Sequence, residues 1–534
     1  MFDSISPPTV IRDDSARARP ALLRPARRAR RTLRDFERTF GAERIHDEAM
    51  VRDREVVLNG LACASLDVAR GDLFVALPGA HAHGARYAAA AAAAGASAIV
   101  TDLAGADLAC ETGLPTLVVD DPRGMLAMFS AWLYGSDADA PTLLGVTGTN
   151  GKTSTVHMLH GILSQMGVHA GLSTTVERRI GGRAVASRLT TPEAPELHAL
   201  LESMREAGAS AVALEVSAHG VSRGRVDGLM FDVVGFTNLT HDHLDEYGGM
   251  EDYFDAKVAL FRPEHARRAV VSVDTEYGER LRRLSGIPVT TITTQPDIPA
   301  DWRVRVTRET PESTWFTLSS TDGRMLQTRV SLMGVHMAAD AGLAIVMLLE
   351  AGFSLQSVST ALESTGLHVH VPGRGERVSG DRGPLVLLDF SHNGDAFEKT
   401  LLALRRVTGG SVVMVVGADG DKDPTKRAHM GRVSAACADI LIITDHHPRH
   451  EDPAAIRAAL RDGAASVPGA DSADVYEIAN PRDAIRAAIA LAGPGDSILW
   501  AGPGLTDYRI VGADRVPYSP HRDTRVALRE AGWL

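Results

Sequence analysis

The sequence predicts an α/β protein with three or four domains built on largely parallel sheets. Short apolar runs rich in valine, isoleucine and leucine recur along the 534 residues, and most lead into a polar loop and a helical pattern. That alternation is typical of parallel strands joined by helices. The length exceeds what one core ordinarily supports, since domains average about 150 residues. A glycine-rich loop near residue 148 and a restart of the alternation after residue 371 indicate a central and a C-terminal domain.

The composition is that of a globular protein in a reducing compartment. Apolar residues make up 44% of the chain, and the net charge of −11 gives no reason to expect a nucleic-acid partner. The three cysteines, Cys63, Cys110 and Cys437, form neither a metal spacing nor a disulfide framework. No apolar stretch approaches the ~20 residues of a membrane span. We therefore expect a cytoplasmic protein without a membrane partner.

The first 43 residues are predicted to be a flexible extension. They contain four prolines and a cluster of arginines between Arg17 and Arg38. Such a cluster is able to contact an acidic surface, but a solvated arm without an assigned function is the simpler interpretation. A first folded domain is expected over residues 44–139, with strands at 72–77 and 98–100 and a helix at 88–94.

A phosphate-binding loop is predicted between the apolar strand that ends at Thr147 and a helix that follows. Glycine at 148 and 151 lets backbone amides approach phosphate oxygens, and the helix N-terminus adds positive potential. Lys152 is able to reach the terminal phosphates, and the Thr153 hydroxyl is a ligand for magnesium. A plain glycine turn is the alternative, and the Gly-Lys-Thr order between strand and helix argues against it. The residues expected at the phosphates are Gly148, Thr149, Asn150, Gly151, Lys152, Thr153 and Ser154.

Two later strands end in polar residues that suit a magnesium site. Residues 212–216 read as a strand with Glu215 at its end, and the strand at 233–238 leads to His243. Ligands of open parallel sheets gather beyond the carboxyl ends of the strands, so these side chains are expected to face the phosphate loop. A carboxylate and a histidine there are able to bind the magnesium that accompanies a triphosphate.

Lysine is rare enough to mark functional candidates. The 56 basic residues include only five lysines, the rest being arginine. A retained lysine is a candidate for a role that needs a compact ammonium or a modifiable amine. By this argument Lys257, shortly after His243, is a functional candidate, whereas a solvated helix lysine is the alternative.

The last predicted domain, residues 371–534, repeats the strand–helix alternation. Its expected strands cover residues 385–389, 412–417, 440–445 and 497–502. This pattern predicts a parallel, Rossmann-like sheet. The first turn lacks the G-x-G-x-x-G fingerprint, which argues against NAD.

Taken together, these motifs resemble the Mur ligases, and within that family the MurE branch of tripeptide synthetases. The similarity spans residues 60–534 and rests on an ordered series of motifs. They are Gly148–Thr153, Thr190-Thr191-Pro192, Glu215-Val216-Ser217, Phe236–Leu239, Asp242–Asp245, Ala256-Lys257, Val371–Arg374, Asp389 with His392, Asp421–Arg427 and Pro448-Arg449. The resemblance implies a nucleotide-sugar (acid substrate) domain at 44–139, an ATP-binding domain at 140–370 and an amino-acid domain at 371–534.

The resemblance also implies the chemistry, in which ATP converts a carboxylate to an acyl phosphate and an amine then displaces phosphate to give an amide. Its catalytic residues would be Lys152, Glu215, His243 and Lys257, the last carbamylated by carbon dioxide. Thr153, Glu215, His243 and Lys257 would hold magnesium, and Arg374, Asp389, His392 and Asn393 would close over the nucleotide. Thr190, Thr191, Ser217 and Arg225 would hold the acid, and Lys422, His447, Arg449 and Gly502 the amino acid. Small-molecule substrates and a monomeric enzyme are expected.

Four motifs differ from the family pattern, and all lie at substrate-selecting or nucleotide-flanking positions. The uridine-binding Asp-Ser-Arg is Ala64-Ser65-Leu66, and the Phe-Asn-x-x-Asn near adenine is His336–Asp340. The diaminopimelate-selecting Asp-Asn-Pro-Arg is His446–Arg449, and Gly-Lys-Gly-His-Glu is Gly502–Thr506. Because two acceptors for an ammonium are lost, we predict that the amino acid is not meso-diaminopimelate, or is held differently.

Three functions remain open at this stage. The first is an ADP-forming acid–amino acid ligase acting in peptidoglycan synthesis. The second is a divergent paralogue that makes an amide bond in another peptide, such as a specialised metabolite. The third is a non-catalytic ATP-binding scaffold, against which Lys152, Glu215, His243 and Lys257 argue. A plain phosphate-loop ATPase or kinase is disfavoured by the second Rossmann-like domain.

Overall fold

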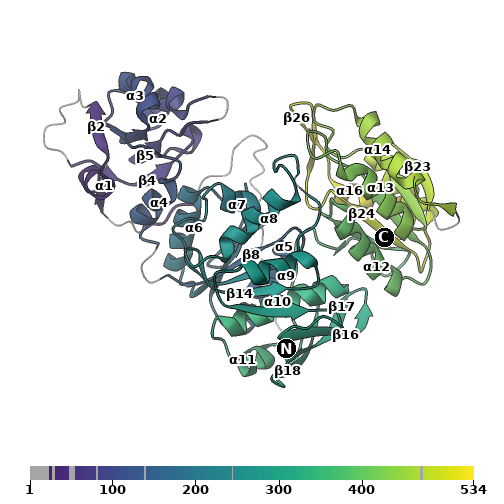
Figure 1. Ribbon diagram of the computed structural model, residues 1–534. Helices are drawn as coiled ribbons and strands as arrows, with labels where there is room; N and C mark the ends of the chain where they lie inside the picture. The colour runs from purple at the N-terminus through teal and green to yellow at the C-terminus, as the bar shows by residue number, and fades with distance from the viewer. Residues whose placement is uncertain are drawn as a thin grey trace. The chain divides into compact units, whose positions relative to one another are not determined.

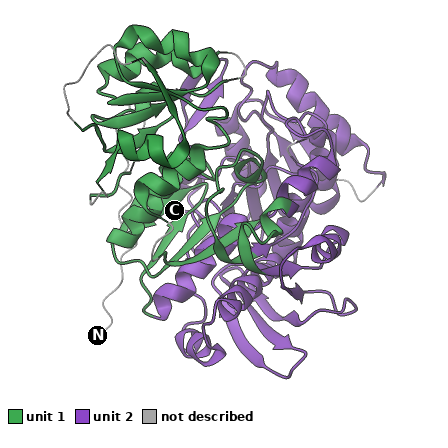
Figure 2. Ribbon diagram, turned by 60° about the vertical axis from the view of Figure 1, so that its left-hand side comes forward, with its two compact units in different colours: residues 1–147, 167–234, 259–268 green, residues 148–166, 235–258, 269–534 purple. Residues whose placement is uncertain are grey.

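The computed structural model describes residues 23–26, 30–46, 55–79, 82–136, 140–242, 244–469 and 473–534. The chain divides into two compact units, each described by itself below (Figure 2). Unit 1 holds residues 1–147, 167–234 and 259–268, and unit 2 holds residues 148–166, 235–258 and 269–534. This division does not fall at residues 140 and 370, and the domain boundaries proposed there stay a prediction. In the described residues, no helix is long and apolar enough to cross a membrane.

Unit 1 begins with a five-stranded sheet in the order β2-β7-β6-β5-β4 (Figure 1). The four strands from β4 to β7 are parallel, and β2 pairs antiparallel at the edge. Alternate residues face opposite sides: Leu73 and Val75 pack towards α1 and α4, whereas Phe74 packs on the alanines of α2. The elements are α1 (Leu33–Phe40), β2 (Glu43–His46), β4 (Gly60–Ala62), β5 (Asp72–Val75), α2 (Ala88–Ala93), β6 (Ala98–Thr101), α3 (Leu103–Ala109), β7 (Thr116–Val118) and α4 (Leu126–Tyr134).

The prediction that the first 43 residues form a flexible arm was wrong from Arg31 onward. Residues 31–32 form β1, which pairs with β3 (Val57–Leu58), and α1 then starts with a capping box between Thr32 and Asp35. Leu33 and Phe36 are buried in the core of the first sheet. Arg34 and Arg38 lie exposed on the outer side of this short amphipathic helix, and the arginine-rich stretch around it concealed its apolar face. Residues 1–22 and 27–29 lie outside the described part of the chain.

The remainder of unit 1 carries the strands that lead to the predicted site. Strands β9, β12 and β8 are parallel neighbours, and β10 and β11 extend this sheet antiparallel beyond β9. Glu215 at the end of β12 pairs with Val146 of β8, two residues before Gly148. The elements are β8 (Thr142–Thr147), β9 (Ala170–Ser173), β10 (Glu177–Ile180), β11 (Arg183–Ala186), α6 (Ala194–Glu206), β12 (Ala211–Glu215), α7 (Ala218–Ser222) and β13 (Phe231–Phe236), whose last residues belong to unit 2.

Unit 2 contains the phosphate-loop helix α5 and the strands that follow β13. Strands β14, β15 and β16 are parallel, and β17 and β18 continue the sheet antiparallel. Helix α10 packs on α5 and is buried along most of its length. The elements are α5 (Lys152–Gln165), α8 (Met250–Val258), β14 (Ala266–Ser272), α9 (Glu276–Leu284), β15 (Val289–Thr293), β16 (Trp302–Thr310), β17 (Ser313–Ser320), β18 (Met325–Val330), α10 (Val335–Glu350) and α11 (Leu355–Leu362).

The C-terminal part of unit 2 is the predicted Rossmann-like sheet, in the order β19-β20-β24-β21-β22-β23. All pairs are parallel except β19 with β20. Residues such as Met414 pack against α12, α13 and α14, whereas Val413 and Val415 pack against α15 and α16. The elements are β19 (Glu376–Arg377), β20 (Leu385–Asp389), α12 (Gly394–Val407), β21 (Val412–Val416), α13 (Lys426–Cys437), β22 (Ile440–Ile443), α14 (Pro453–Ala465), β23 (Asp474–Glu477), α15 (Pro481–Leu491), β24 (Ser497–Ala501), β25 (Tyr508–Val511), β26 (Asp514–Pro517) and α16 (Pro520–Glu530).

Candidate active site

The phosphate loop, residues 148–154, has a backbone that only glycine allows at two positions. Gly148 and Gly151 have φ angles of +148° and +90°, in the region that side chains rarely adopt. A Cβ at Gly148 would also lie 1.9 Å from Thr237 Oγ1. That hydroxyl donates to the carbonyl of Asn150 over 2.6 Å, so the loop closes tightly on the residues after β13. Gly151 then serves as the N-cap of α5 without a side chain over the first amides, which suits the binding of an anion.

Two of the five lysines meet at one carbonyl of this loop. Lys152 Nζ donates to Gly148 O and Thr149 O over 3.0 and 2.8 Å, and Lys257 Nζ donates to Gly148 O over 2.8 Å. Lys257 is 1% exposed and lies 4.3 Å from the ring centroid of Tyr253. Its burial, and then the charge of Lys152, lower the pKa of Lys257 well below the usual value of a lysine, although Asp242 opposes this shift. The amine therefore gives up its proton more readily than that of an ordinary lysine.

Residues before and along α12 approach the phosphate loop within unit 2. The Asn150 amide nitrogen donates to Asn393 and Asp395 over 3.2 and 2.9 Å, and Asn393 donates back to Asn150 Oδ1 over 3.1 Å. The Arg374 guanidinium lies 3.4 Å from Thr153 Oγ1 and stacks on Phe390 at 4.7 Å. The structure thus brings Arg374 and Asn393 to the loop, as the sequence predicts.

The other two residues expected at the nucleotide have different surroundings. Asp389 accepts from the amide of Gly375 over 2.7 Å and from Ser391, so it fixes the two turns beside it. His392 Nε2 lies 3.3 Å from the carboxylate of Asp242.

Asp242 links the segment after β13 to helices α12 and α13. Its two oxygens meet Lys426 Nζ at 2.8 Å and the Asn393 amide at 3.2 Å, and the side chain is buried. The sequence motifs that resemble the family include Asp242, after β13, but predicted no role for it and none for Lys426. The scarcity of lysine was the signal that could have found Lys426. His243, the next residue after Asp242, lies outside the described residues, so its predicted role stays a prediction.

In unit 1, the predicted metal ligand Glu215 is held by a threonine that sequence reasoning missed. Glu215 is 4% exposed and accepts from the Thr175 amide over 2.9 Å and from its hydroxyl over 3.1 Å. Thr175 Oγ1 also lies 3.0 Å from the Thr190 hydroxyl. No periodicity marks Thr175, because it lies in the short loop between β9 and β10.

The four residues predicted to hold the acid substrate share one hydrogen-bond network with Glu215. Thr190 joins it through Thr175, and the Thr191 hydroxyl donates to the Glu215 carbonyl over 3.0 Å and lies 3.2 Å from Ser217 Oγ. Arg225 donates to the Thr191 carbonyl over 3.0 Å and pairs with Glu193 over 2.8 Å. The structure therefore brings Thr190, Thr191, Ser217 and Arg225 together at the ends of β12 and α6.

A buried carboxyl group lies directly beneath the phosphate loop. A Cβ at Gly151 would be 2.5 Å from Asp340 Oδ1, so the loop backbone rests on the Asp340 side chain. Burial raises the pKa of Asp340 to about 8, although Lys399, a hydrogen bond with Thr155 and Arg374 oppose this shift. The carboxyl group is protonated at neutral pH and resembles the asparagine that the family pattern has in this motif.

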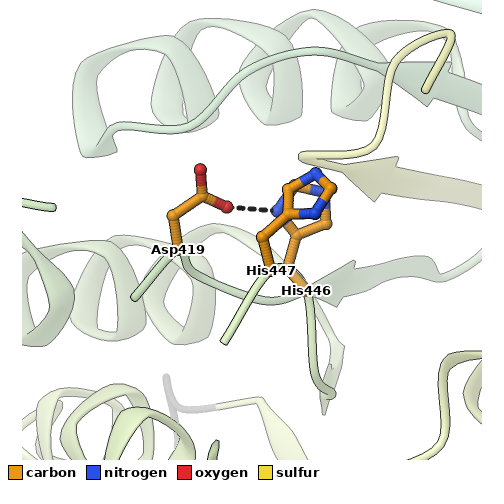
Figure 3. Close-up of side chains that lie close together, drawn as sticks. All are labelled: Asp419, His446 and His447. Atoms are coloured by element: carbon orange, nitrogen blue, oxygen red, sulfur yellow. Dashed lines mark hydrogen bonds and ion pairs between the residues drawn. The ribbon is translucent and has the colours of Figure 1, made fainter. Parts of the chain in front are cut away.

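A second polar cluster, the histidine corner, comprises Asp419, His446, His447, Arg449 and Gly502. Figure 3 shows the first three. Asp419 Oδ1 lies 2.6 Å from His446 Nδ1, and Asp419 Oδ2 lies 3.7 Å from the Arg449 guanidinium. Burial lowers the pKa of His447 to about 4, helped by the charge of His446, and His447 Nδ1 accepts from the Ile510 amide over 3.0 Å. His447 is therefore neutral.

Burial alone would raise the pKa of Asp419, but the charge and hydrogen bond of His446, together with the charge of Arg449, lower it well below its usual value. Asp419 is therefore a carboxylate at neutral pH. Lys422 was predicted to bind the same substrate as this corner. Its ion pairs are instead with Asp245 and Glu246, at 3.8 and 3.7 Å.

Three family models match the chain. Residues 57–132 match "Mur ligase family, catalytic domain", residues 146–348 "Mur ligase middle domain" and residues 373–504 "Mur ligase, glutamate ligase domain". A protein named UDP-N-acetylmuramyl-tripeptide synthetase from Leifsonia xyli is 54% identical over 96% of this chain and 99% of its own length. A UDP-N-acetylmuramoyl-L-alanyl-D-glutamate–2,6-diaminopimelate ligase from Streptomyces coelicolor is 42% identical over 90% of this chain and 93% of its own length.

Solved structures share the fold. A UDP-N-acetylmuramoyl-L-alanyl-D-glutamate–2,6-diaminopimelate ligase matches with a TM-score of 0.61 and 24% identity, over 94% of this chain and all of that one. MurF from Thermotoga maritima in complex with ADP matches with a TM-score of 0.61 and 17% identity, over 88% of this chain and 97% of that one. The three-domain α/β architecture predicted from the motifs is thereby confirmed. On its matched models and its 54% identical relative, the chain belongs to the Mur ligase family.

Proposed function

We propose that this protein adds an amino acid to the carboxylate of a UDP-N-acetylmuramoyl dipeptide, with conversion of ATP to ADP and phosphate. As a Mur ligase it is an enzyme that forms carbon–nitrogen bonds. The observation that carries the proposal is the meeting of Lys152 and Lys257 at the Gly148 carbonyl, within a loop shaped by Gly148 and Gly151. The name of the 54% identical relative, a tripeptide synthetase, supports the acid substrate.

The residues of the phosphate loop fit a magnesium-bound ATP. Its glycines expose backbone amides, Lys152 supplies a positive charge, and Thr153 supplies a hydroxyl at the start of α5. Glu215 and His243 are the further ligands that we propose for magnesium, with hard oxygen and imidazole donors. The metal supplies neutralisation of the charge that develops as the γ-phosphoryl group leaves. Structures of similar fold that carry ADP, such as the Thermotoga maritima MurF, support the nucleotide.

We propose that Lys257 is carbamylated. Burial and then Lys152 lower the pKa of Lys257, which favours the neutral amine, the form that attacks carbon dioxide. One proton leaves the nitrogen, and the product is a carbamate anion in place of a cation. Such an anion has oxygen donors for magnesium, and arginine could not form it.

The remaining steps belong to the two substrate sites. The acid would be held by Thr190, Thr191, Ser217 and Arg225 while its carboxylate accepts the γ-phosphoryl group of ATP. His447, Arg449 and Gly502 would hold the amino acid, whose neutral amine attacks the acyl phosphate carbon and expels phosphate. Lys152 would stay with the phosphate oxygens throughout, since its ammonium matches the charge that develops there.

The relatives differ in what their names say about the amino acid. Relatives at 38–42% identity are named for 2,6-diaminopimelate, whereas the name of the 54% identical relative specifies no amino acid. Leu66, at the position where the family pattern has arginine, is 85% exposed. These departures favour a second candidate, a paralogue that acts on a different acid and amine. A non-catalytic scaffold remains the third candidate, disfavoured by Lys152 and Lys257.

A coupled assay distinguishes these functions. Purified enzyme is mixed with magnesium-ATP, UDP-N-acetylmuramoyl-L-alanyl-D-glutamate and a panel of amino acids, and phosphate release and product mass are measured. We expect phosphate release that requires both the acid and an amino acid, with a product heavier by one residue. Phosphate release that depends on neither the acid nor the amino acid would overturn the proposal. So would the absence of turnover with every combination of acid and amino acid. We also propose a cytoplasmic monomer, because ATP and nucleotide sugars are cytoplasmic, and sedimentation tests the oligomeric state.

A further inference from the structure

Strands β16, β17 and β18 have one face packed on α10 and one face turned to solvent (Figure 1). Val304 and Leu326 are buried on the inner face, and a Cβ at Gly342 of α10 would lie 2.4 Å from Val304 Cγ2. Successive residues of a strand point to opposite sides of the sheet. Arg305 and Gln327, which directly follow these apolar residues, therefore lie on the outer face, and both are exposed.

A β-bulge brings a third arginine of β16 to this outer face. Arg303 and Arg305 share a face because they are two residues apart, whereas Arg308 is three residues further on. The register between β16 and β17 shifts before Arg308, which then pairs with Trp315, and the extra residue restores the side on which the next side chain lies. On the other side of β17, Arg329 of β18 also pairs with Trp315. We call these four arginines and Trp315 the arginine face.

Two of these arginines are held over the ring of Trp315. The guanidinium carbon of Arg308 lies 4.8 Å from the ring centroid, and that of Arg329 lies 5.5 Å from it. Stacking on an indole orients a planar guanidinium and leaves the N–H groups on its edge for a ligand. Arginines that are oriented in this way lose less side-chain entropy on binding than free ones.

The protein does not neutralise the charges of the arginine face. Among the described residues, none of its four arginines forms an ion pair with a carboxylate. Arg329 donates to the Thr365 carbonyl over 3.1 Å, and Arg303 donates to the carbonyls of Gln295 and Ile298. The chain has 67 acidic and 56 basic residues, so four neighbouring arginines without a carboxylate indicate a surface that meets an anion.

Arg324, in the turn between β17 and β18, provides a matched comparison within the same sheet. Its guanidinium carbon lies 4.8 Å from the ring centroid of Trp302, the same distance as that of Arg308 from Trp315. However, Arg324 pairs with Asp322 over 2.7 Å, and its hydrogen bonds are the main reason that the pKa of Asp322 lies well below its usual value. One arginine–tryptophan stack is thus neutralised, whereas the other keeps its charge.

The spacing of the arginines suits carboxylates on an extended peptide. Residues two apart in a strand are separated by about 6.7 Å, which is also the repeat of alternate side chains in any extended chain. An extended segment along β16 with acidic residues at every second position therefore meets Arg303 and Arg305 in register, and Arg308 beyond the bulge. Each planar guanidinium is able to hold one carboxylate through two N–H groups.

Other anionic partners fit this face less well. A membrane surface requires apolar side chains that protrude, and in β16–β18 the one large apolar residue that is exposed is Met325. Nucleic-acid bases require a free aromatic ring, whereas two guanidinium groups already lie over Trp315. The net charge of −11 also opposes the approach of a polyanion as large as either.

We propose that the arginine face is a docking site for an extended acidic segment of a partner protein, with carboxylates at alternate positions. None of its residues belongs to the phosphate loop or to the predicted substrate sites. The inference therefore goes beyond the proposed ligase function and does not depend on it.

A peptide probe tests the proposal on the full-length enzyme. Fluorescence anisotropy measures the binding of a fluorescein-labelled peptide in which glutamate alternates with serine. Arg308→Gln removes one unpaired charge, so we expect the Kd to rise about threefold, and in Arg305→Gln/Arg308→Gln about tenfold. Arg324→Gln removes the same charge and the same kind of stack, but from a neutralised pair, and should leave the Kd unchanged. Added salt should weaken the binding by the wild type.

Three results would overturn the proposal. The first is the absence of peptide binding by the wild type, and the second is an equal rise in Kd in Arg308→Gln and Arg324→Gln. The third is tighter binding of phosphatidylglycerol vesicles, or of a thymidine oligonucleotide, with the same dependence on Arg308. Melting temperatures equal to that of the wild type show that the variants are folded. A failed ligase assay leaves this inference standing, because peptide binding needs no turnover.

Discussion

The phosphate loop and the histidine corner hold their polar groups by opposite means. At the loop, Lys152 and Lys257 bond to backbone carbonyls whose positions are fixed by glycines. At the corner, Asp419 and His446 hold each other, side chain to side chain. A backbone site tolerates few substitutions, because every residue in the turn shapes it, whereas a site of paired side chains changes specificity with one or two substitutions. This difference explains why the family pattern persists at the loop and departs at the corner.

The largest effect is expected at the loop. Lys152→Ala removes a charge that stays with the phosphate oxygens in the transition state, so we expect kcat to fall about 10³-fold or more. Phosphate release with saturating substrates measures it. The melting temperature should change little, since Lys152 Nζ donates to two carbonyls of its own loop. A fall in kcat of less than tenfold would contradict the expectation that the loop tolerates substitution less well than the histidine corner.

The second effect concerns the carbamate proposed on Lys257. Lys257→Arg keeps a positive charge but cannot be carbamylated, so we expect kcat to fall about 100-fold. In Lys257→Ala, added acetate or propionate should restore part of the activity by supplying a carboxylate at the same place. Rescue of the alanine variant but not the arginine variant is the diagnostic result. Full activity of Lys257→Arg would rule the carbamate out.

At the histidine corner, a substitution should affect the KM for the amino acid and not the KM values for the other substrates. Arg449→Lys retains the charge but loses the planar fork, and we expect the KM for the amino acid to rise about tenfold. The KM values for ATP and for the acid should stay within twofold. Steady-state kinetics with each substrate varied in turn provides the measurement. An effect on ATP instead would show that the two regions are not separable.

The smallest effect concerns the free energy of unfolding, through Asp340 beneath the phosphate loop. Because the pKa of Asp340 is raised to about 8 in the folded protein, the folded state holds a proton that the unfolded state releases near pH 4. The favourable contribution is complete below pH 4 and is lost as pH rises towards 8. Asp340→Asn removes this dependence, so its free energy of unfolding relative to wild type should increase by about 1 kcal/mol or more between pH 5 and pH 8. Urea denaturation at both pH values tests this, and a constant difference would contradict it.

Much of the fold and part of the site followed from local patterns. The strands at residues 385–389 and 412–416 were predictable because buried parallel strands are short, continuous apolar runs. Lys257 was predictable because lysine is rare. The pair of Asp419 and His446 was not, since the two residues end different strands and no spacing links them. Asp340 was noted only as a departure, because its role depends on burial against Gly151, which the sequence does not encode locally.

Helix α1 was missed for a different reason. Its eight residues include two arginines and follow an arginine-rich stretch, so they look like part of a solvated arm. Only the partner surface of β3 and α4 makes Leu33 and Phe36 a core face.

A residue that precedes α1 in the sequence also forms an ion pair with the first sheet. The Arg24 guanidinium spans both oxygens of Asp72, at 2.6 and 2.5 Å, beside the Cα of Gly60, and Asp72 is fully buried. A chain that begins at the start of α1 would lack Arg24, and the buried Asp72 carboxylate would lose this counterion. Loss of one partner of a buried ion pair lowers the free energy of unfolding by several kcal/mol. Shortened versions meant for crystallisation or screening should therefore retain Arg24, even though the residues around it look dispensable.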